Sequence, residues 1–142
     1  MFAIRSAKPD DAGEIVGLDP LAREREDRRA FIARSVEAGA CSLIFDSERL
    51  IGYAVLDYTF FGQGFISILF VSPTNRRQGA GSTLLRHLEA LCRTRKLFTS
   101  ANLSNLPMQR LLARQGFDLC GVVHGLDEGD PELVYMKYLN RM

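Results

Sequence analysis

The feature that most constrains this chain is a continuous apolar run, Phe65–Val71, which leads through a short loop to two closely spaced glycines. The run is apolar on both faces except at Ser67, as is typical of a central strand covered on both sides. From Gly79 onward the apolar residues follow a helical spacing. They are Leu84, Leu85, Leu88, Leu91 and Cys92. The sequence therefore predicts a central strand, a glycine loop and an amphipathic helix in direct succession.

The glycine loop has the properties of an anion-binding site. The start of a helix presents unpaired N–H groups and the positive end of the helix dipole. Gly79 and Gly81 carry no Cβ, so an anion can approach this backbone closely. Arg76 and Arg77 add positive charge beside it. The loop is sufficient for a pyrophosphate, although a plain turn before a helix can contain the same two glycines.

Two standard phosphate-binding motifs are excluded by the residues of this loop. The Walker motif requires Gly-Lys-Ser/Thr, which is absent from the sequence. The dinucleotide motif GxGxxG fails because Leu84 stands at the position of its third glycine. The pattern that remains is Arg-x-x-Gly-x-Gly over residues 76–81, after a strand that ends in Val71-x-Pro73.

A second motif lies further along the chain, where Asn105 stands eleven residues before Gly116-Phe117 with Met108 and Leu111 between them. The two motifs together resemble the GNAT N-acetyltransferase superfamily. Its signatures are Gln/Arg-x-x-Gly-x-Gly/Ala, for acetyl-CoA, and Asn-x-x-Ala-x-x-Leu-Tyr ending in Gly-Phe. The predicted element order is also similar to the GNAT fold over nearly the whole chain. The resemblance implies an enzyme that moves an acetyl group from acetyl-CoA to an amine.

The predicted order of elements is β-α-α-β-β-β-α-β-α-β-β in a single domain, residues 1–142. This order mixes hairpins with crossover helices, so we expect the α+β class and a mixed, mostly antiparallel sheet of six or seven strands with about four helices. The expected strands are Phe2–Ser6, Cys41–Phe45, Leu50–Thr59, Phe65–Val71, Leu97–Ala101, Phe117–Val123 and Glu132–Leu139. The expected helices end at about Leu18, span Leu21–Ala38, begin at Gly79, and span Leu106–Gln115.

The resemblance also implies a cofactor site. The pyrophosphate would be held by the loop between strand and helix, and the pantetheine arm would pair with the end of the central strand. The central strand would then diverge from Leu97–Ala101 to make room for the arm. The implied cofactor-binding residues are Leu69, Phe70, Val71, Arg76, Arg77, Gln78, Gly79, Ala80, Gly81, Ser82, Asn105 and Met108.

The implied reaction is direct attack of an amine on the thioester. A free alkylamine has a pKa of about 10.4, so it must lose a proton to a base or a water chain before it attacks. A backbone N–H near Leu69 would polarise the acetyl carbonyl. The chain departs from the family pattern at two places. Leu112 occupies the register of the usual Tyr acid, and Ser67 and Ile68 occupy the usual places of a carboxylate base.

The general base and acid are therefore left unassigned, with His124, Tyr58 and Glu132 as candidates beside Asp57 and Tyr135. Each of these residues could instead have a purely structural role. A histidine on a strand can simply be exposed to solvent, and a tyrosine on a strand commonly packs against its neighbours. The acidic loop before Glu132 could attract a cationic amine, or it could be an ordinary solvated hairpin loop. The loop residues are Asp127, Glu128 and Asp130.

Charge and composition limit the expected binding partners, cellular location and metal content of the protein. The net charge is +1, from 18 basic and 17 acidic residues, so neither nucleic acid nor an anionic membrane is an expected partner. The arginines of the second helix predict a solvated face on which Glu24 and Arg28 form an i,i+4 ion pair. The three cysteines lack metal-site or disulfide spacing, and no stretch reads as a signal peptide or membrane span. We expect a cytoplasmic protein without a metal.

Several alternatives stay open at this point. The chain could be a non-catalytic acyl-CoA-binding sensor or regulatory module, which the missing Tyr and carboxylate favour. The acceptor could be a small-molecule amine or a peptide, and in this fold its choice depends on the segments 18–38 and 124–132. The acyl chain length is not fixed by the sequence, and the protein could be a monomer or a homodimer.

Overall fold

The computed structural model describes residues 1–140. Seven strands, five α-helices and two 3-10 helices make up this part of the chain. The strands are β1 (Phe2–Ser6), β2 (Cys41–Asp46), β3 (Arg49–Phe60), β4 (Gln63–Val71), β5 (Lys96–Asn102), β6 (Asp118–Val123) and β7 (Glu132–Tyr138). The helices are η1 (Pro9–Asp11), α1 (Ala12–Leu18), α2 (Pro20–Glu24), α3 (Glu26–Glu37), η2 (Pro73–Asn75), α4 (Ala80–Leu91) and α5 (Leu106–Arg114).

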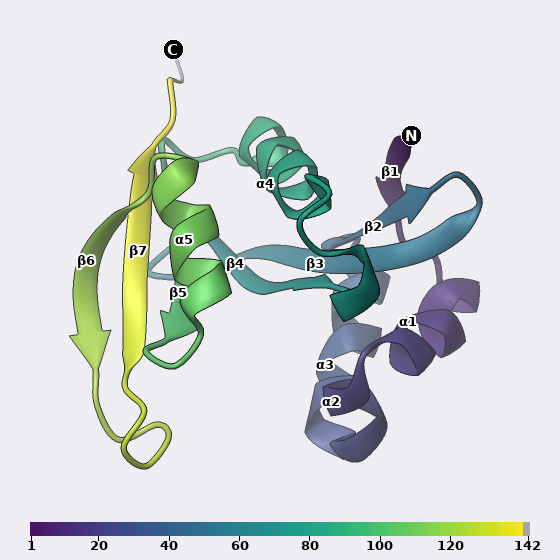
Figure 1. Ribbon diagram of the computed structural model, residues 1–142, viewed down its shortest axis with the longest axis horizontal. Coiled ribbons are helices and arrows are strands. Elements are labelled where there is room, and N and C mark those ends of the chain that lie inside the picture. The colour runs from purple at the N-terminus through teal and green to yellow at the C-terminus, as the bar shows by residue number, and fades with distance from the viewer. Residues whose placement is uncertain (141–142) are drawn as a thin grey trace. The chain divides into compact units, whose positions relative to one another are not determined.

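Hydrogen bonding orders the strands as β1-β2-β3-β4-β5-β7-β6 (Figure 1). β4 pairs in parallel with β5, whereas β1 with β2, β2 with β3, β5 with β7, and β6 with β7 are antiparallel. The predicted mixed, mostly antiparallel sheet and the α+β class are therefore confirmed. The apolar run of residues 65–71 forms most of β4, the fourth of the seven strands.

The chain divides into two compact units. The first contains Met1–Leu56 and Ile68–Leu88, and the second contains Asp57–Ser67 and the chain from Glu89 onward. β3 and β4 each contribute one part to both units, so the division does not follow a linker. The expectation of a single domain over residues 1–142 stays a prediction.

The first unit has its core between the helices α1–α3 and the strands β2 and β3. Ile15 from α1, Ile32 from α3 and Tyr53 from β3 are at most 1% exposed and belong to one apolar cluster. α4 lies on the other side of β3 from these helices (Figure 1). Its Leu84, Leu85 and Leu88 are completely buried. The helical spacing of these leucines is thus explained by burial of one helix face.

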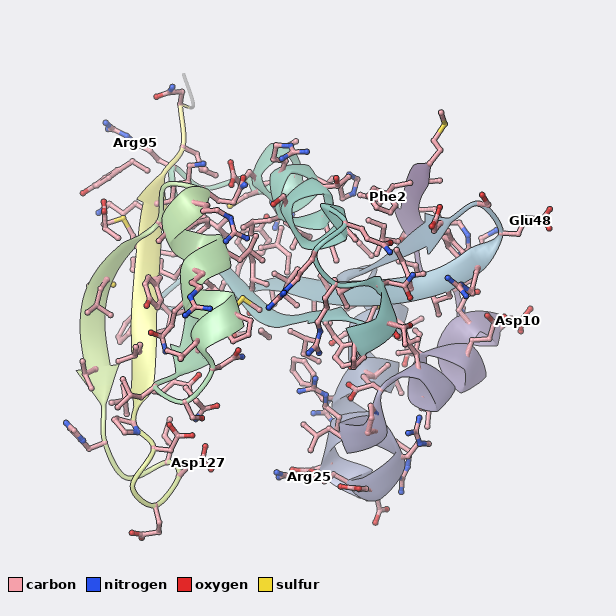
Figure 2. The ribbon with its side chains drawn as sticks, in the orientation of Figure 1. Phe2, Asp10, Arg25, Glu48, Arg95 and Asp127 are labelled. Carbon is pink, nitrogen blue, oxygen red and sulfur yellow. The ribbon has the colours of Figure 1, made fainter. Side chains whose placement is uncertain are left out.

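The predicted helix Leu21–Ala38 is wrong in one respect, because the structure has two helices with a break at Arg25. Arg25 is extended, with φ −122° and ψ 120°, at the junction of α2 and α3 (Figure 2). The guanidinium of Arg29 donates to the carbonyl oxygens of Ala22 (2.9 Å) and Arg23 (3.0 Å). These bonds satisfy the carbonyl groups that the end of α2 leaves open, and so stabilise the break.

The second unit is built from β5, β7 and β6 with α5 and the hairpin end of β3 and β4. Asn105 is the N-cap of α5, because its side chain accepts from the Met108 N–H at 3.2 Å. Gly116 follows the helix with φ +85°, a conformation that glycine adopts readily. In the same unit, the rings of Phe60 and Phe65 stack with centroids 5.1 Å apart.

One predicted core residue of α4 is not in the core. Leu91 was expected on the buried face of the helix but is 50% exposed. α4 ends at Leu91, and the next residue, Cys92, is 2% exposed and takes the inward position instead. The helical periodicity therefore holds up to Leu88 and fails where the helix stops.

Candidate functional site

The start of α4 has the geometry of an anion site. Gly79 adopts φ +87°, and a Cβ placed there would meet no atom within 4 Å, so the space beside this backbone is open. α4 follows directly and is 12 residues long. The backbone N–H and the hydroxyl of Thr83 both bond to the Gly79 carbonyl, at 3.0 and 2.8 Å, and close the first turn. The first-turn amides and the positive end of the helix dipole favour an anion here.

The two arginines before the glycines are both exposed, but they differ in conformation. Arg76 folds back on the end of β4, where its Nε donates to the Val71 carbonyl at 2.9 Å. Its guanidinium lies 5.9 Å from the centroid of the Phe70 ring. Arg77 has φ +67° and turns the chain toward Gly79. Positive charge is thus held at the loop, as the sequence predicted.

The end of β4 lies in the same unit as this loop. Leu69, Phe70 and Val71 are half-buried, and the Phe70 ring lies 5.9 Å from the ring of Tyr53. The Val71 carbonyl accepts from Arg76, and its second lone pair can still accept from a ligand. The first unit therefore brings together ten of the predicted cofactor-binding residues, Leu69–Val71 and Arg76–Ser82.

The other two predicted cofactor-binding residues belong to the second unit. Asn105 is exposed and caps α5, and Met108 on the first turn of α5 is half-buried. Their approach to the glycine loop stays a prediction. The divergence of β4 from β5 also stays a prediction. The pairing of these strands runs from Gly64↔Leu97 to Ile66↔Thr99, and the Thr99 hydroxyl donates to the Ile66 carbonyl at 3.0 Å.

The three catalytic candidates from the sequence do not form one cluster. The hydroxyl of Tyr58 accepts from the backbone N–H of Arg93 at 3.0 Å, and the Arg93 guanidinium lies 4.1 Å from the ring centroid. This phenol is therefore used in packing. His124 is exposed just beyond β6, and Glu132 begins β7 opposite Val123. His124 and Glu132 thus share one end of the β6–β7 hairpin.

Two further residues considered from the sequence, Leu112 and Tyr135, are both buried. Leu112, at the register of the usual Tyr acid, is completely buried and has no proton to donate. Tyr135, a lesser candidate, is 8% exposed on β7. Leu112 therefore supplies no acid, and a catalytic role for Tyr135 stays a prediction.

The acidic loop between β6 and β7 is held by hydrogen bonds. Asp127, labelled in Figure 2, accepts from the Asn102 side chain at 3.0 Å. Asp130 accepts from the backbone N–H and the hydroxyl of Ser104, at 3.0 and 2.6 Å. Two of the carboxylates that could have attracted an amine are therefore occupied in fixing the loop to the segment before α5.

Sequence reasoning missed a buried polar network in the first unit. Asp19, 1% exposed, accepts from the Tyr53 hydroxyl at 2.5 Å and from the Arg28 Nη2 at 3.1 Å. Burial raises the pKa of Tyr53, and the hydrogen bond to Asp19 raises it further. Arg28 therefore pairs with Asp19 rather than with Glu24, which corrects the predicted i,i+4 pair. The break at Arg25 removes the continuous helix that the pair required.

A second cluster joins β3 to β4 in the second unit. The carboxylate of Asp57 accepts from the hydroxyl of Ser67, and also from the hydroxyl and the backbone N–H of Thr59, at 2.7 and 3.2 Å. The tight turn Phe61-Gly62 joins the two strands, but Asp57 lies four residues before it and Ser67 five residues after it, so equal spacing from the turn does not predict this pair. Sequence reasoning considered Asp57 and Ser67 separately.

Neither a metal centre nor a membrane helix is found in the described chain. Among residues 1–140, no three side chains of His, Cys, Asp or Glu gather where they could hold a metal ion. Within the same residues, no helix is long and apolar enough to cross a membrane.

Comparison with known proteins gives consistent matches. Residues 7–117 match the model of the acetyltransferase (GNAT) family. Streptothricin acetyltransferase of Streptomyces lavendulae is 30% identical over 125 residues, which are 85% of this chain and 60% of that protein. The chain thus spans less than two thirds of the length of this relative.

Solved structures agree with these sequence matches. An acetyltransferase of the GNAT family from Bacillus cereus is 35% identical, with a TM-score of 0.92 over 99% of both chains. A Salmonella typhimurium acetyltransferase, solved with its cofactor acetyl-CoA, shares the fold at 16% identity, with a TM-score of 0.78 over 99% of this chain and 95% of that one.

Proposed function

The chain belongs to the acetyltransferase (GNAT) family, and we propose that it transfers the acetyl group of acetyl-CoA to an amine of a small molecule or peptide. The observation that carries this proposal is the start of α4. Gly79 leaves open space beside the first turn of a 12-residue helix, and Arg76 and Arg77 lie next to it. A pyrophosphate fits this combination of amides, helix dipole and guanidinium groups.

The residues of this loop would hold the nucleotide end of the cofactor, and the end of β4 would hold its arm. When bound, acetyl-CoA supplies the acetyl group as an activated thioester. The acceptor amine is protonated at neutral pH and needs a proton acceptor before it can attack. The chain offers no phenol at Leu112 to protonate the departing sulfur. A thiol with a pKa near 8.5 can leave without that help, so the loss is tolerable.

The acceptor is proposed by class. The streptothricin acetyltransferase relative makes the amine of streptothricin one acceptor to test, and the exposed ends of α2 and of the β6–β7 hairpin leave room for others. We place the reaction in the cytoplasm, which three free cysteines support because thiols persist in reducing compartments. The protein would act as a monomer or a homodimer.

Turnover is tested with four amines that represent different acceptor classes: streptothricin, spermidine, L-lysine and a short peptide with a free N-terminal alanine. Release of the CoA thiol is followed with a chromogenic thiol reagent, and the acetylated amine is identified by mass spectrometry. We expect at least one amine to accelerate thiol release above the rate without protein. A Gly81→Glu variant, which brings negative charge into the first turn of α4, should lose this activity.

The second reading, a non-catalytic acyl-CoA-binding module, rests on the completely buried Leu112. It would be favoured if acetyl-CoA bound saturably while none of the four amines released thiol. Release of thiol with formation of the acetylated amine would exclude it.

A further inference from the structure

Asp57 and Ser67 form a connected pair across the β3–β4 hairpin of the second unit. Ser67 Oγ donates its hydrogen to Asp57 Oδ2, while Thr59 donates twice to the other carboxylate oxygen. The side chains of Asp57 and Ser67 are half-buried, so both are partly open to solvent. The pair is therefore ordered by its own hydrogen bonds and still accessible to a small ligand.

The direction of these bonds fixes what Ser67 can bind. A hydroxyl has one hydrogen to donate, and Asp57 takes it, so the Ser67 oxygen can only accept from a further partner. A primary ammonium group has three donors and no acceptor, which makes it the complementary partner. The carboxylate behind the hydroxyl adds a negative charge that attracts such a cation.

The position of Ser67 along β4 matches the distance that the reaction requires. Ser67 precedes Leu69 by two residues on one strand, which corresponds to about 7 Å. An amine about 3 Å from the acetyl carbonyl carbon, with its hydrogen-bond acceptor about 3 Å beyond, spans a similar length. An acetyl group polarised by the N–H near Leu69 would thus leave the amine within reach of the Ser67 oxygen.

We propose that Ser67 binds the ammonium group of the acceptor and, with Asp57 behind it, accepts its proton. This inference rests on the proposed function and assigns the base that the sequence left open. Ser67 is the catalytic residue because it touches the amine, and Asp57 is a positioning residue that acts through it. Tyr58 is less suited to the role, because its hydroxyl already accepts from the Arg93 N–H.

The proton step balances within the pair. One ammonium proton moves to Ser67 Oγ while the original hydroxyl proton of Ser67 moves to the Asp57 carboxylate. The neutral amine then forms the C–N bond as the C–S bond breaks. A second amine proton ends on the departing sulfur, the third stays on the amide nitrogen, and the Asp57 proton returns to water.

The first test measures binding of the cation. The protein is labelled with ¹⁵N, saturated with CoA and titrated at pH 7 with ethylammonium chloride or with methoxyamine, a neutral amine of the same shape. Sodium chloride at equal concentration is the blank. We expect ethylammonium, but not methoxyamine, to shift the amide resonances of Ser67 and Asp57. The shifts should be lost in Asp57→Asn and Ser67→Ala. They should be kept in Thr59→Ala, which removes one donor, the hydroxyl, from the other carboxylate oxygen and keeps the backbone N–H.

The second test measures turnover of the same two amines. Ser67→Ala and Asp57→Asn should slow acetylation of ethylamine by about 10²- to 10⁴-fold, because a positioned base is removed. Methoxyamine needs no prior loss of a proton, so Asp57→Asn should acetylate it at close to the wild-type rate. Ser67→Thr keeps the hydroxyl and should retain most of the ethylamine activity. If Asp57→Asn does not fold, the rate of ethylamine acetylation by Ser67→Ala, compared with Ser67→Thr, provides the test.

Two outcomes would overturn the inference while leaving the proposed function intact, provided calorimetry shows that acetyl-CoA binds. One is equal loss of activity toward both amines in Asp57→Asn, which indicates a structural role. The other is absence of ethylammonium-dependent shifts at Ser67 in the wild-type protein. Failure of acetyl-CoA to bind the folded wild type would instead overturn the proposed function itself.

Discussion

Cys41 and Tyr53 are buried side chains whose ionised forms are disfavoured by folding. Burial raises the pKa of the Cys41 thiol to about 12, and the nearby negative charge of Asp11 adds to the effect. Burial and the hydrogen bond to Asp19 raise the pKa of Tyr53. A group whose pKa is higher in the folded protein stabilises it fully below its unfolded pKa, and this stabilisation is lost as the pH rises toward the folded value.

We therefore expect the protein to lose stability above about pH 9, the ordinary pKa of the Cys41 thiol. Between its unfolded and folded pKa values, each such group lowers the free energy of unfolding by up to about 1.4 kcal/mol per pH unit. Urea unfolding of the wild type and of Cys41→Ala at pH 8, 9 and 10, with reductant present, measures this slope. The cavity left by Cys41→Ala shifts its stability at every pH, so only the slopes are compared.

The variant should show the shallower decrease between pH 9 and pH 10. Parallel decreases in the two proteins would show that the Cys41 thiol does not contribute. Tyr53 begins to contribute only above its ordinary pKa of about 10, so this interval isolates the cysteine.

At the scale of elements, Asn105 has two roles that can be separated. It caps α5 through its side-chain oxygen, and the family resemblance also assigns it to the pantetheine arm. Asparagine and aspartate are comparable N-caps, whereas alanine is a poor one. Replacing Asn105 by aspartate and by alanine therefore separates capping of α5 from binding of the cofactor by the side-chain amide.

We expect Asn105→Ala to lower the free energy of unfolding by about 1 kcal/mol, and Asn105→Asp to leave it close to the wild-type value. If the amide also binds the cofactor, Asn105→Asp should weaken acetyl-CoA binding although the helix remains capped. Denaturant unfolding and calorimetry on the two variants provide both readouts. Full acetyl-CoA affinity in Asn105→Asp would remove Asn105 from the cofactor site.

The elements that the sequence predicted well are those with local signals. Alternation and apolar runs located the strands within one or two residues, and the expected helix Leu106–Gln115 ends one residue beyond α5. The break at Arg25 had no such signal. It depends on the Arg29 guanidinium reaching the last carbonyl groups of α2, a contact that exists only after the helices have packed.

At the scale of the whole molecule, the family and the open backbone at the start of α4 could be predicted from spacing, because glycines before a helix have a direct backbone consequence. The two polar clusters around Asp19 and Asp57 could not be predicted from spacing in the sequence. Asp19 is buried against Tyr53 from a strand 34 residues away, and Asp57 meets Ser67 only across a hairpin. Pairings of this kind follow from strand register and helix packing, so a single residue's neighbours in the sequence do not reveal them.

The central claim is that the start of α4 binds the pyrophosphate of acetyl-CoA. Calorimetric titration of acetyl-CoA into the wild type, Gly81→Glu and Gly13→Glu tests it most directly. Gly13 is a matched control because it also lies in a helix of the first unit, and a Cβ there would meet no atom within 4 Å. We predict saturable binding to the wild type and Gly13→Glu, and loss of binding in Gly81→Glu. Equal binding by all three proteins, or none by the folded wild type, would contradict the claim.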